Sequence, residues 1–298
     1  MASKSSELEI VRGNPNVKSV GVEIQYTPEQ IKEYVKCARN PVYFIESYCK
    51  VVSLDRGIVP FKMFDYQKRI VDTVHNHRFT IGKLFRQSGK STIMAAYILW
   101  YVSFNANKTA CILGNKQAIA AEILSRVQYM HELLPNWLKQ GVSVWNRLSV
   151  NFENGSKVFC ASSSASSVRG HSINLLMLDE FAFLPNDKAD EFMASVFPTL
   201  SSSKDSKIII ISTPNGMNHF AKIWLEAEEG KNNFVTVEGK WQEARDKEWA
   251  DNMFKLLGKT RFNAEILCVS PETKVTVFDK IEQREKEISI GELYSELS

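Results

Sequence analysis

The stretch Thr80–Thr92, TIGKLFRQSGKST, decides the fold class of this 298-residue chain. Its first residues predict a β-strand, and an apolar helical segment follows it directly. The turn between them, Gly89-Lys90-Ser91, is typical of a loop that binds phosphate, because a helix N-terminus directs backbone N–H groups at an anion. In such loops the lysine contacts the β- and γ-phosphates and the hydroxyl contacts Mg²⁺. The stretch departs from the usual pattern at Leu84, where a first glycine is expected.

Strand-like and helical segments alternate along the chain, which favours a parallel sheet with crossover helices. The runs LLML and IIII are apolar without alternation, as in strands that are buried on both faces. Asn154-Gly155 separates two alternating runs and predicts a hairpin over Ser149–Ala161. The expected fold is α/β: a three-layer P-loop NTPase core of the RecA/ASCE-like kind with a mostly parallel sheet. The predicted strands are Thr80–Phe85, Lys108–Leu113, Leu175–Leu178 and Lys207–Ser212, and the long helices are Ser91–Phe104, Lys116–Leu134 and Asp187–Leu200.

The two ends of the chain differ from this core. Residues 1–25 are polar and aperiodic, and we expect them to be flexible. A small helical part follows, with Thr27 as the N-cap of a first helix and a second helix over Pro41–Val51. The whole chain has a net charge of +3, but residues 268–298 carry four Lys or Arg against seven Asp or Glu. This change in composition indicates a separate, short and β-rich C-terminal fragment.

A second buried strand ends in two carboxylates, in the sequence LLMLDE over Leu175–Glu180. A P-loop enzyme holds Mg²⁺ with a carboxylate at that edge of its sheet, which predicts this role for Asp179. Glu180 beside it is placed to polarise the attacking water. The next apolar strand ends in Ser212-Thr213, whose hydroxyls would sense the γ-phosphate or that water.

Two more side chains belong to the predicted nucleotide site. Arg86 lies inside the loop, where it would stabilise charge on the transferring phosphoryl group. Gln67, in Tyr66-Gln67 upstream of the first strand, offers an amide that matches the donor and acceptor edge of adenine. ATP and Mg²⁺ are therefore the expected ligands. The residues predicted to bind the nucleotide are Gln67, Arg86, Gln87, Ser88, Gly89, Lys90, Ser91 and Thr92.

Composition excludes several other classes of protein. The chain is 44% hydrophobic and 24% charged, which is ordinary for a globular protein. Its longest apolar stretch, Ile93–Phe104, is shorter than the ~20 residues of a membrane span, so no membrane partner is expected. The five cysteines show no CxxC spacing, which indicates neither a disulfide framework nor a zinc cluster.

Together these motifs resemble the ATPase domain of large terminase subunits, the DNA-packaging motors of tailed bacteriophages, and most of all the T-even-like type. The resemblance covers about residues 25 to 267. A phosphate loop without its first glycine is itself typical of terminases. The resemblance rests on FRQSGKST (Phe85–Thr92), LLPNW (Leu133–Trp137), NGS (Asn154–Ser156), VRG (Val168–Gly170), MLDEFAFLPN (Met177–Asn186) and STPNGMNHF (Ser212–Phe220).

The resemblance implies an ATPase that translocates viral double-stranded DNA into a procapsid, in the cytoplasm of the host cell. The implied partners are the DNA, the portal protein and procapsid, the small terminase subunit, and further copies of the chain in a ring. The family's C-terminal nuclease domain is not expected in 298 residues. The implied site residues are Lys90 and Ser91 on phosphate and Mg²⁺, Asp179 on Mg²⁺, Glu180 as catalytic carboxylate, Arg86 as an arginine finger in cis or in trans, Gln67 at adenine, and Thr213 in the motif that couples hydrolysis to movement.

The C-terminal segment resembles the opening block of an intein instead. Cys268 stands at the junction, and Pro271 and Thr273 follow it in a polar turn before a β-rich run. The chemistry requires a cysteine there, because its thiol attacks the carbonyl of Leu267 in an N-to-S acyl shift. The alternative is a terminase cysteine followed by a β-hairpin. The expected domains are a flexible N-terminus (1–25), the ATPase domain (26–267) and an intein N-terminal fragment (268–298). This fragment is either one half of a split intein, whose partner would be a complementary C-terminal intein fragment, or part of a truncated reading frame.

Two other functions compete with a terminase ATPase. A superfamily-2-type helicase shares a carboxylate motif such as DEFA and a glutamine such as Gln67, but it requires a second RecA-like domain. A nucleotide-binding scaffold without turnover shares the phosphate loop, but it has no need of Glu180.

Overall fold

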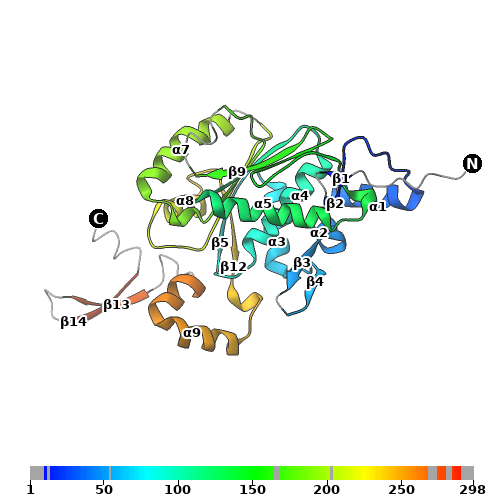
Figure 1. The fold of residues 1–298 in the computed structure, drawn as a ribbon. Helices are drawn as coiled ribbons and strands as arrows, with labels where there is room; N and C mark the ends of the chain where they lie inside the picture. The colour runs from blue at the N-terminus through cyan, green and yellow to red at the C-terminus, as the bar shows by residue number, and fades with distance from the viewer. Residues whose placement is uncertain are drawn as a thin grey trace, which may run out of the picture.

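A central sheet with helices on both faces forms the body of the protein, as a computed structural model shows (Figure 1). The structure describes residues 10–11, 14–53, 55–163, 168, 170–201, 204–267, 274–279 and 284–289. The eight strands have the order β12-β5-β11-β10-β6-β9-β8-β7. The first six are parallel neighbours, whereas β8 pairs antiparallel with β9 and β7 pairs antiparallel with β8. The strands are β5 (Phe79–Leu84), β6 (Thr109–Gly114), β7 (Val142–Trp145), β8 (Ser149–Phe152), β9 (Lys157–Ser162), β10 (Leu175–Asp179), β11 (Lys207–Ser212) and β12 (Val235–Gly239).

Each face of the sheet has its own hydrophobic core, because successive side chains of a strand point to opposite faces. In β10, Leu175 and Met177 pack into the core under α3, α4 and α5, whereas Leu176 and Leu178 pack against α7 and α8. The apolar runs without alternation are therefore buried on both sides, and the predicted three-layer α/β fold is confirmed. The helices are α1 (Pro28–Arg39), α2 (Pro41–Tyr48), α3 (Asp65–Asn76), α4 (Lys90–Phe104), α5 (Gln117–Glu132), α7 (Asn186–Ser201), α8 (His219–Glu228) and α9 (Lys247–Phe262).

The helix that follows the phosphate loop, α4, is apolar on nearly every side. It packs between α5, α2 and α3, and the indole of Trp100 donates to the carbonyl of Cys37 at 2.8 Å. A helix that is hydrophobic all round is a buried one. Of the helices in the described part of the chain, none is long and apolar enough to cross a membrane.

Residues 14–18 contradict the prediction of a flexible N-terminus. They form strand β2, which pairs with β1 (Ile10–Val11), and Val17 is fully buried. Nζ of Lys18 lies 3.2 Å from Oε1 of Glu153. The segment therefore lies along the β7 edge of the sheet, and its polar residues are bound by specific partners that no periodic pattern reveals.

The second predicted helix, Pro41–Val51, extends too far. α2 ends at Tyr48, and β3 (Lys50–Ser53) then pairs antiparallel with β4 (Gly57–Pro60). The β-branched pair Val51-Val52 and the turn before Gly57 (φ 67°) favour a hairpin over a further helical turn.

The C-terminal segment forms a separate hairpin in the described residues, at the left of Figure 1. β13 (Lys274–Asp279) pairs antiparallel with β14 (Arg284–Ser289) over six residue pairs. The prediction of a β-rich fragment is confirmed for these residues.

Candidate active site

The phosphate loop links the buried strand β5 to α4. Gly89 precedes the helix with φ 78° and ψ 14°, a left-handed conformation that favours glycine. A Cβ atom at this position would also lie only 3.0 Å from Nε2 of Gln67. Gln87 has a positive φ of 64° as well. The loop thus turns back sharply, which leaves the N-terminus of α4 facing the C-terminal edge of the sheet.

Helix α3 fixes this loop from behind. Nε2 of Gln67 donates to the carbonyl of Ser88 at 3.0 Å, and Oε1 of Gln67 accepts from the backbone of Phe64 at 3.0 Å. The hydroxyl of Tyr66 donates to the same Ser88 carbonyl. Gln67 is only 4% exposed, and its amide is used within the protein. Contact between Gln67 and adenine therefore remains a prediction, and the geometry gives Gln67 a role in supporting the loop.

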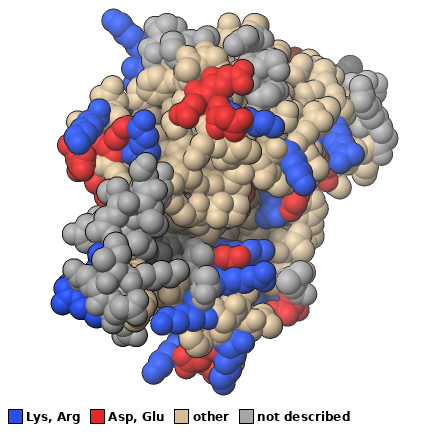
Figure 2. Space-filling model, turned by 90° about the vertical axis from the view of Figure 1, so that its left-hand side faces the viewer, with Lys and Arg blue, Asp and Glu red and all other residues tan. Residues whose placement is uncertain are grey.

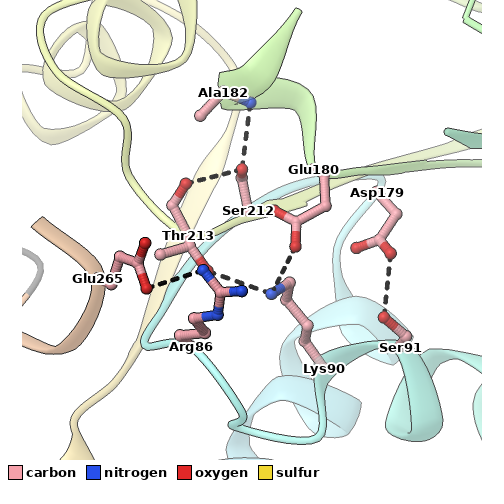
Figure 3. A network of polar contacts seen from close by, with 9 residues as sticks. All are labelled: Arg86, Lys90, Ser91, Asp179, Glu180, Ala182, Ser212, Thr213 and Glu265. Carbon is pink, nitrogen blue, oxygen red and sulfur yellow. Dashed lines mark hydrogen bonds and ion pairs between the residues drawn. The ribbon is translucent and has the colours of Figure 1, made fainter. Parts of the chain in front are cut away.

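Lys90, the first residue of α4, contacts the side chains that follow β10 and β11, as Figure 3 shows. Its Nζ lies 2.9 Å from Oε1 of Glu180 and donates to Oγ1 of Thr213 at 3.1 Å. Lys90 is 8% exposed and Thr213 is 3% exposed. The predicted lysine, carboxylate and hydroxyl, which lie far apart in the sequence, therefore form one cluster.

Asp179 and Ser91 form the neighbouring pair. The hydroxyl of Ser91 donates to Oδ2 of Asp179 at 3.0 Å. Burial raises the pKa of Asp179 to about 6, although the Lys90 ammonium opposes this shift. Oδ1 of Asp179 and Oε2 of Glu180 are buried and have no partner among the described residues. Hard oxygen donors with free lone pairs fit Mg²⁺, and a cation would lower the pKa of Asp179 again.

The backbone of Glu180 is strained. Its φ of 53° and ψ of 37° place a non-glycine residue in the left-handed region, which is costly and is typical of functional sites. The residue follows the last residue of β10 and is the N-cap of the short 3₁₀ helix η2 (Phe181–Phe183). The turn directs the Glu180 side chain toward Lys90.

Arg86 contacts the C-terminal part of the domain. Its Nη1 lies 2.8 Å from Oε2 of Glu265, and its backbone N–H donates to the Glu265 carbonyl at 2.8 Å. Glu265 belongs to the π-helix η4 (Asn263–Leu267), and the Arg86 side chain is 61% exposed. Sequence reasoning missed Glu265, since no local pattern links residues this far apart in the chain.

Of the other residues predicted from the sequence, some are described by the structure and some are not. Oγ1 of Thr92 accepts from Nη1 of Arg126 on α5 at 2.7 Å, so this hydroxyl is turned toward α5. Ser88 is buried, whereas Gln87 is exposed. Cys268, and Arg169 of the VRG motif, lie outside the residues that the structure describes.

The face of the protein at the left of Figure 1 is turned to the viewer in Figure 2, where Lys and Arg side chains gather on its lower part. α9 lies at this height in Figure 1, and its exposed basic residues are Lys247, Lys255, Lys259 and Arg261.

A cavity of about 230 Å³ lies between the end of β12 and η4, with Gly239, Trp241 and Leu267 among its lining residues. Because Gly239 pairs with Leu84 in the sheet, this cavity lies beside the start of the phosphate loop.

Comparison with solved structures places the fold among phage terminases. The large terminase ATPase domain of Thermus phage P74-26 has a TM-score of 0.54 at 21% identity, over 70% of this chain and 94% of that one. The large terminase of bacteriophage HK97 has a TM-score of 0.66 at 17% identity, over 80% of this chain and 56% of that one. The large terminase of another thermophilic bacteriophage, in complex with ATP-gamma-S, has a TM-score of 0.56 at 13% identity, over 74% of this chain and 57% of that one.

These identities show the shared fold, and the chain spans little more than half the length of the last two proteins. The sequence itself matches the family described as "Terminase large subunit, T4likevirus-type, N-terminal" over residues 85–284. That match covers more than half of the chain and includes the phosphate loop, both carboxylates and Thr213. The chain therefore belongs to the T4-like terminase large subunit family, of which it carries the N-terminal region.

Proposed function

We propose that this chain is the ATPase motor part of a terminase large subunit, which hydrolyses ATP to translocate viral double-stranded DNA into a procapsid. The observation that carries the proposal is the cluster of Lys90, Glu180 and Thr213 beside the Ser91–Asp179 pair. A cation for phosphate, a carboxylate for water and an oxygen pair for a metal ion are the parts that phosphoryl transfer needs.

Each of these residues has its own task in the proposed reaction. The backbone N–H groups at the start of α4 and the Lys90 ammonium bind the β- and γ-phosphates. When Lys90 turns to the phosphates, Oε1 of Glu180 loses its partner and becomes free to orient and deprotonate the attacking water. Ser91 and Asp179 would hold Mg²⁺, which neutralises charge on the phosphates. Until then, the ion pair with Lys90 keeps the Glu180 carboxylate occupied.

Translocation of DNA and the packaging partners rest on family membership. They comprise double-stranded DNA, the portal protein and procapsid, the small terminase subunit and a ring of copies of the chain, acting in the host cytoplasm. The family match favours this function over a superfamily-2-type helicase. The other competing function is a nucleotide-binding scaffold without turnover, which an experiment on the site can distinguish from an ATPase.

Glu180→Gln separates an enzyme from a scaffold. The substitution keeps the size and a hydrogen-bonding oxygen but removes the base, so we expect kcat for ATP to fall by ~10²-fold or more while ATP affinity stays within a few-fold. Steady-state phosphate release and fluorescent-nucleotide titration measure the two quantities. Loss of affinity with unchanged kcat would show that Glu180 serves binding, and unchanged values of both would reject the proposed site.

We also propose that Cys268 opens an intein fragment. The charge reversal after residue 267 and the β13–β14 hairpin support this, whereas the terminase family match continues to residue 284. In an N-to-S acyl shift the Cys268 thiol attacks the Leu267 carbonyl, and the peptide bond to the Cys268 nitrogen is replaced by a thioester.

Co-expression with a matching C-terminal intein fragment tests this second proposal. Mass spectrometry should find Leu267 joined to new sequence and residues 268–298 removed, and Cys268→Ala should eliminate that product. If the chain stays intact beside a competent partner fragment, then Cys268 is an ordinary terminase cysteine and the hairpin belongs to the terminase.

A further inference from the structure

The turn that carries Glu180 is held by a side chain outside the predicted site. Glu180 has a left-handed backbone, and such a conformation persists only where its surroundings fix it. Strand β11 supplies two of the fixing contacts. The backbone N–H of Glu180 donates to the Ile211 carbonyl at 3.0 Å, and the backbone N–H of Ala182 donates to Oγ of Ser212 at 3.1 Å.

The third contact comes from Asn218. Its Nδ2 donates to the carbonyl of Ala182 at 2.6 Å and to the carbonyl of Asn215 at 2.9 Å. Nδ2 of Asn215 donates to the same Ala182 carbonyl at 3.3 Å. Ala182 lies in η2, two residues after Glu180, and is itself 2% exposed. The backbone of this turn is thus bound on its N–H side by β11 and on its carbonyl side by Asn218, whose bond is the shorter one, and by Asn215.

The amide oxygen of the Asn218 side chain caps the helix that follows. Oδ1 of Asn218 accepts from the backbone of Ala221 at 3.2 Å, so Asn218 is the N-cap of α8. The next residue, His219, has its N–H bound to Oδ1 of Asn186 and its ring beside Asp190, both on α7. One amide therefore connects the turn of Glu180 to α8, which is tied to α7.

We propose that Asn218 is a positioning residue for hydrolysis, which sets the orientation of the Glu180 carboxylate by holding the Ala182 carbonyl. The inference rests on the proposed ATPase function and deepens it. Without Asn218 the Ala182 carbonyl keeps only the longer bond from Asn215, so the left-handed turn can relax and move Glu180 away from the γ-phosphate. Misplacement of a catalytic group by about 1 Å can cost ~10²-fold in rate, so the effect falls on kcat.

Two substitutions separate positioning from capping. Asn218→Ser and Asn218→Asp both retain an oxygen that caps α8, since serine and aspartate are strong N-caps. Neither can donate an amide hydrogen to the Ala182 carbonyl. We expect both variants to lower kcat by roughly 10- to 10²-fold, with KM for ATP within a few-fold and little change in Tm.

Thr27→Ala is the matched control, because it removes an N-cap far from the site. Oγ1 of Thr27 accepts from the backbone of Gln30 at 3.2 Å, at the start of α1. This variant should lose stability and keep kcat. If Asn218→Ser instead lowers Tm and leaves kcat unchanged, Asn218 is only a cap and the inference is overturned.

A double-mutant cycle with Glu180→Gln gives the sharper result. If Asn218 acts through the Glu180 carboxylate, Asn218→Ser should cost almost nothing further once that carboxylate is absent. An equal cost in both backgrounds would place its effect elsewhere and reject the inference. Should Glu180→Gln alone leave turnover unchanged, both the proposed function and the inference fail, whereas a loss with Glu180→Gln and none with Asn218→Ser rejects only the inference.

Discussion

Lys90→Ala should abolish ATP turnover. The ammonium is the one group in the described site that contacts both the Glu180 carboxylate and the Thr213 hydroxyl, at 2.9 Å from Oε1 of Glu180 and 3.1 Å from Oγ1 of Thr213. Its replacement removes the charge that offsets the β- and γ-phosphates and leaves Glu180 facing them unpaired. We therefore expect both weaker ATP binding and turnover below detection in a phosphate-release assay.

Lys139→Ala provides the comparison for loss of a buried lysine. Lys139 is 6% exposed, and its Nζ donates to the carbonyl of Asn16 at 2.9 Å, outside the site. This variant should lose stability but hydrolyse ATP at the wild-type rate once folded. A Lys90→Ala protein that retains the wild-type kcat would place the nucleotide somewhere else on the molecule.

Arg86→Ala should lower kcat by ~10³-fold or more, the effect of an arginine finger in well-studied NTPases. Arg86 lies in the phosphate loop but is paired with Glu265 in the structure. We expect an arginine finger to leave such a partner and contact the transferring phosphoryl group, which places its contribution in the transition state. Nucleotide affinity should therefore change little. Phosphate release at saturating ATP and nucleotide titration measure the two effects.

Two further variants serve as controls for Arg86→Ala. Arg86→Lys should rescue poorly, because a point charge cannot reproduce the planar guanidinium. Arg69→Ala removes a comparable exposed ion pair, in which Nη2 lies 2.7 Å from Oε1 of Glu243, and should keep kcat. Equal losses of nucleotide affinity and kcat with Arg86→Ala would show that Arg86 binds the nucleotide in the ground state and does not act specifically on the transition state.

The sequence predicted the sheet and the ends of its strands well, for a physical reason. Buried parallel strands need unbroken apolar runs, and the carboxyl ends of such strands meet at one edge, so LLMLDE and IIIIST had to place Asp179, Glu180 and Thr213 together. The two edges of the sheet were harder to predict. Residues 14–18 lie beside the β7 edge through single contacts such as the ion pair of Lys18 with Glu153, and β12 is a short strand of five residues.

Contacts between distant segments explain what the sequence left open at the site. The pairing of Arg86 with Glu265 and the bond from Asn218 to Ala182 each join segments that no periodicity relates. For Gln67 the sequence predicted the residue and a contact with adenine. In the structure its amide is bound to Ser88 and Phe64 within the protein. The strained φ of Glu180 likewise follows from β11 and α8 around it.

A structure of the protein with Mg²⁺ and a non-hydrolysable ATP analogue would show directly whether the nucleotide binds at this cluster. We expect the β- and γ-phosphates at the N-terminus of α4, with Nζ of Lys90 moved from Oε1 of Glu180 to a phosphate oxygen and the cation between Ser91 and Asp179. The Glu180 carboxylate should then face the γ-phosphate across one water. A nucleotide bound elsewhere, or one at α4 with the Lys90–Glu180 ion pair still intact, would contradict this expectation.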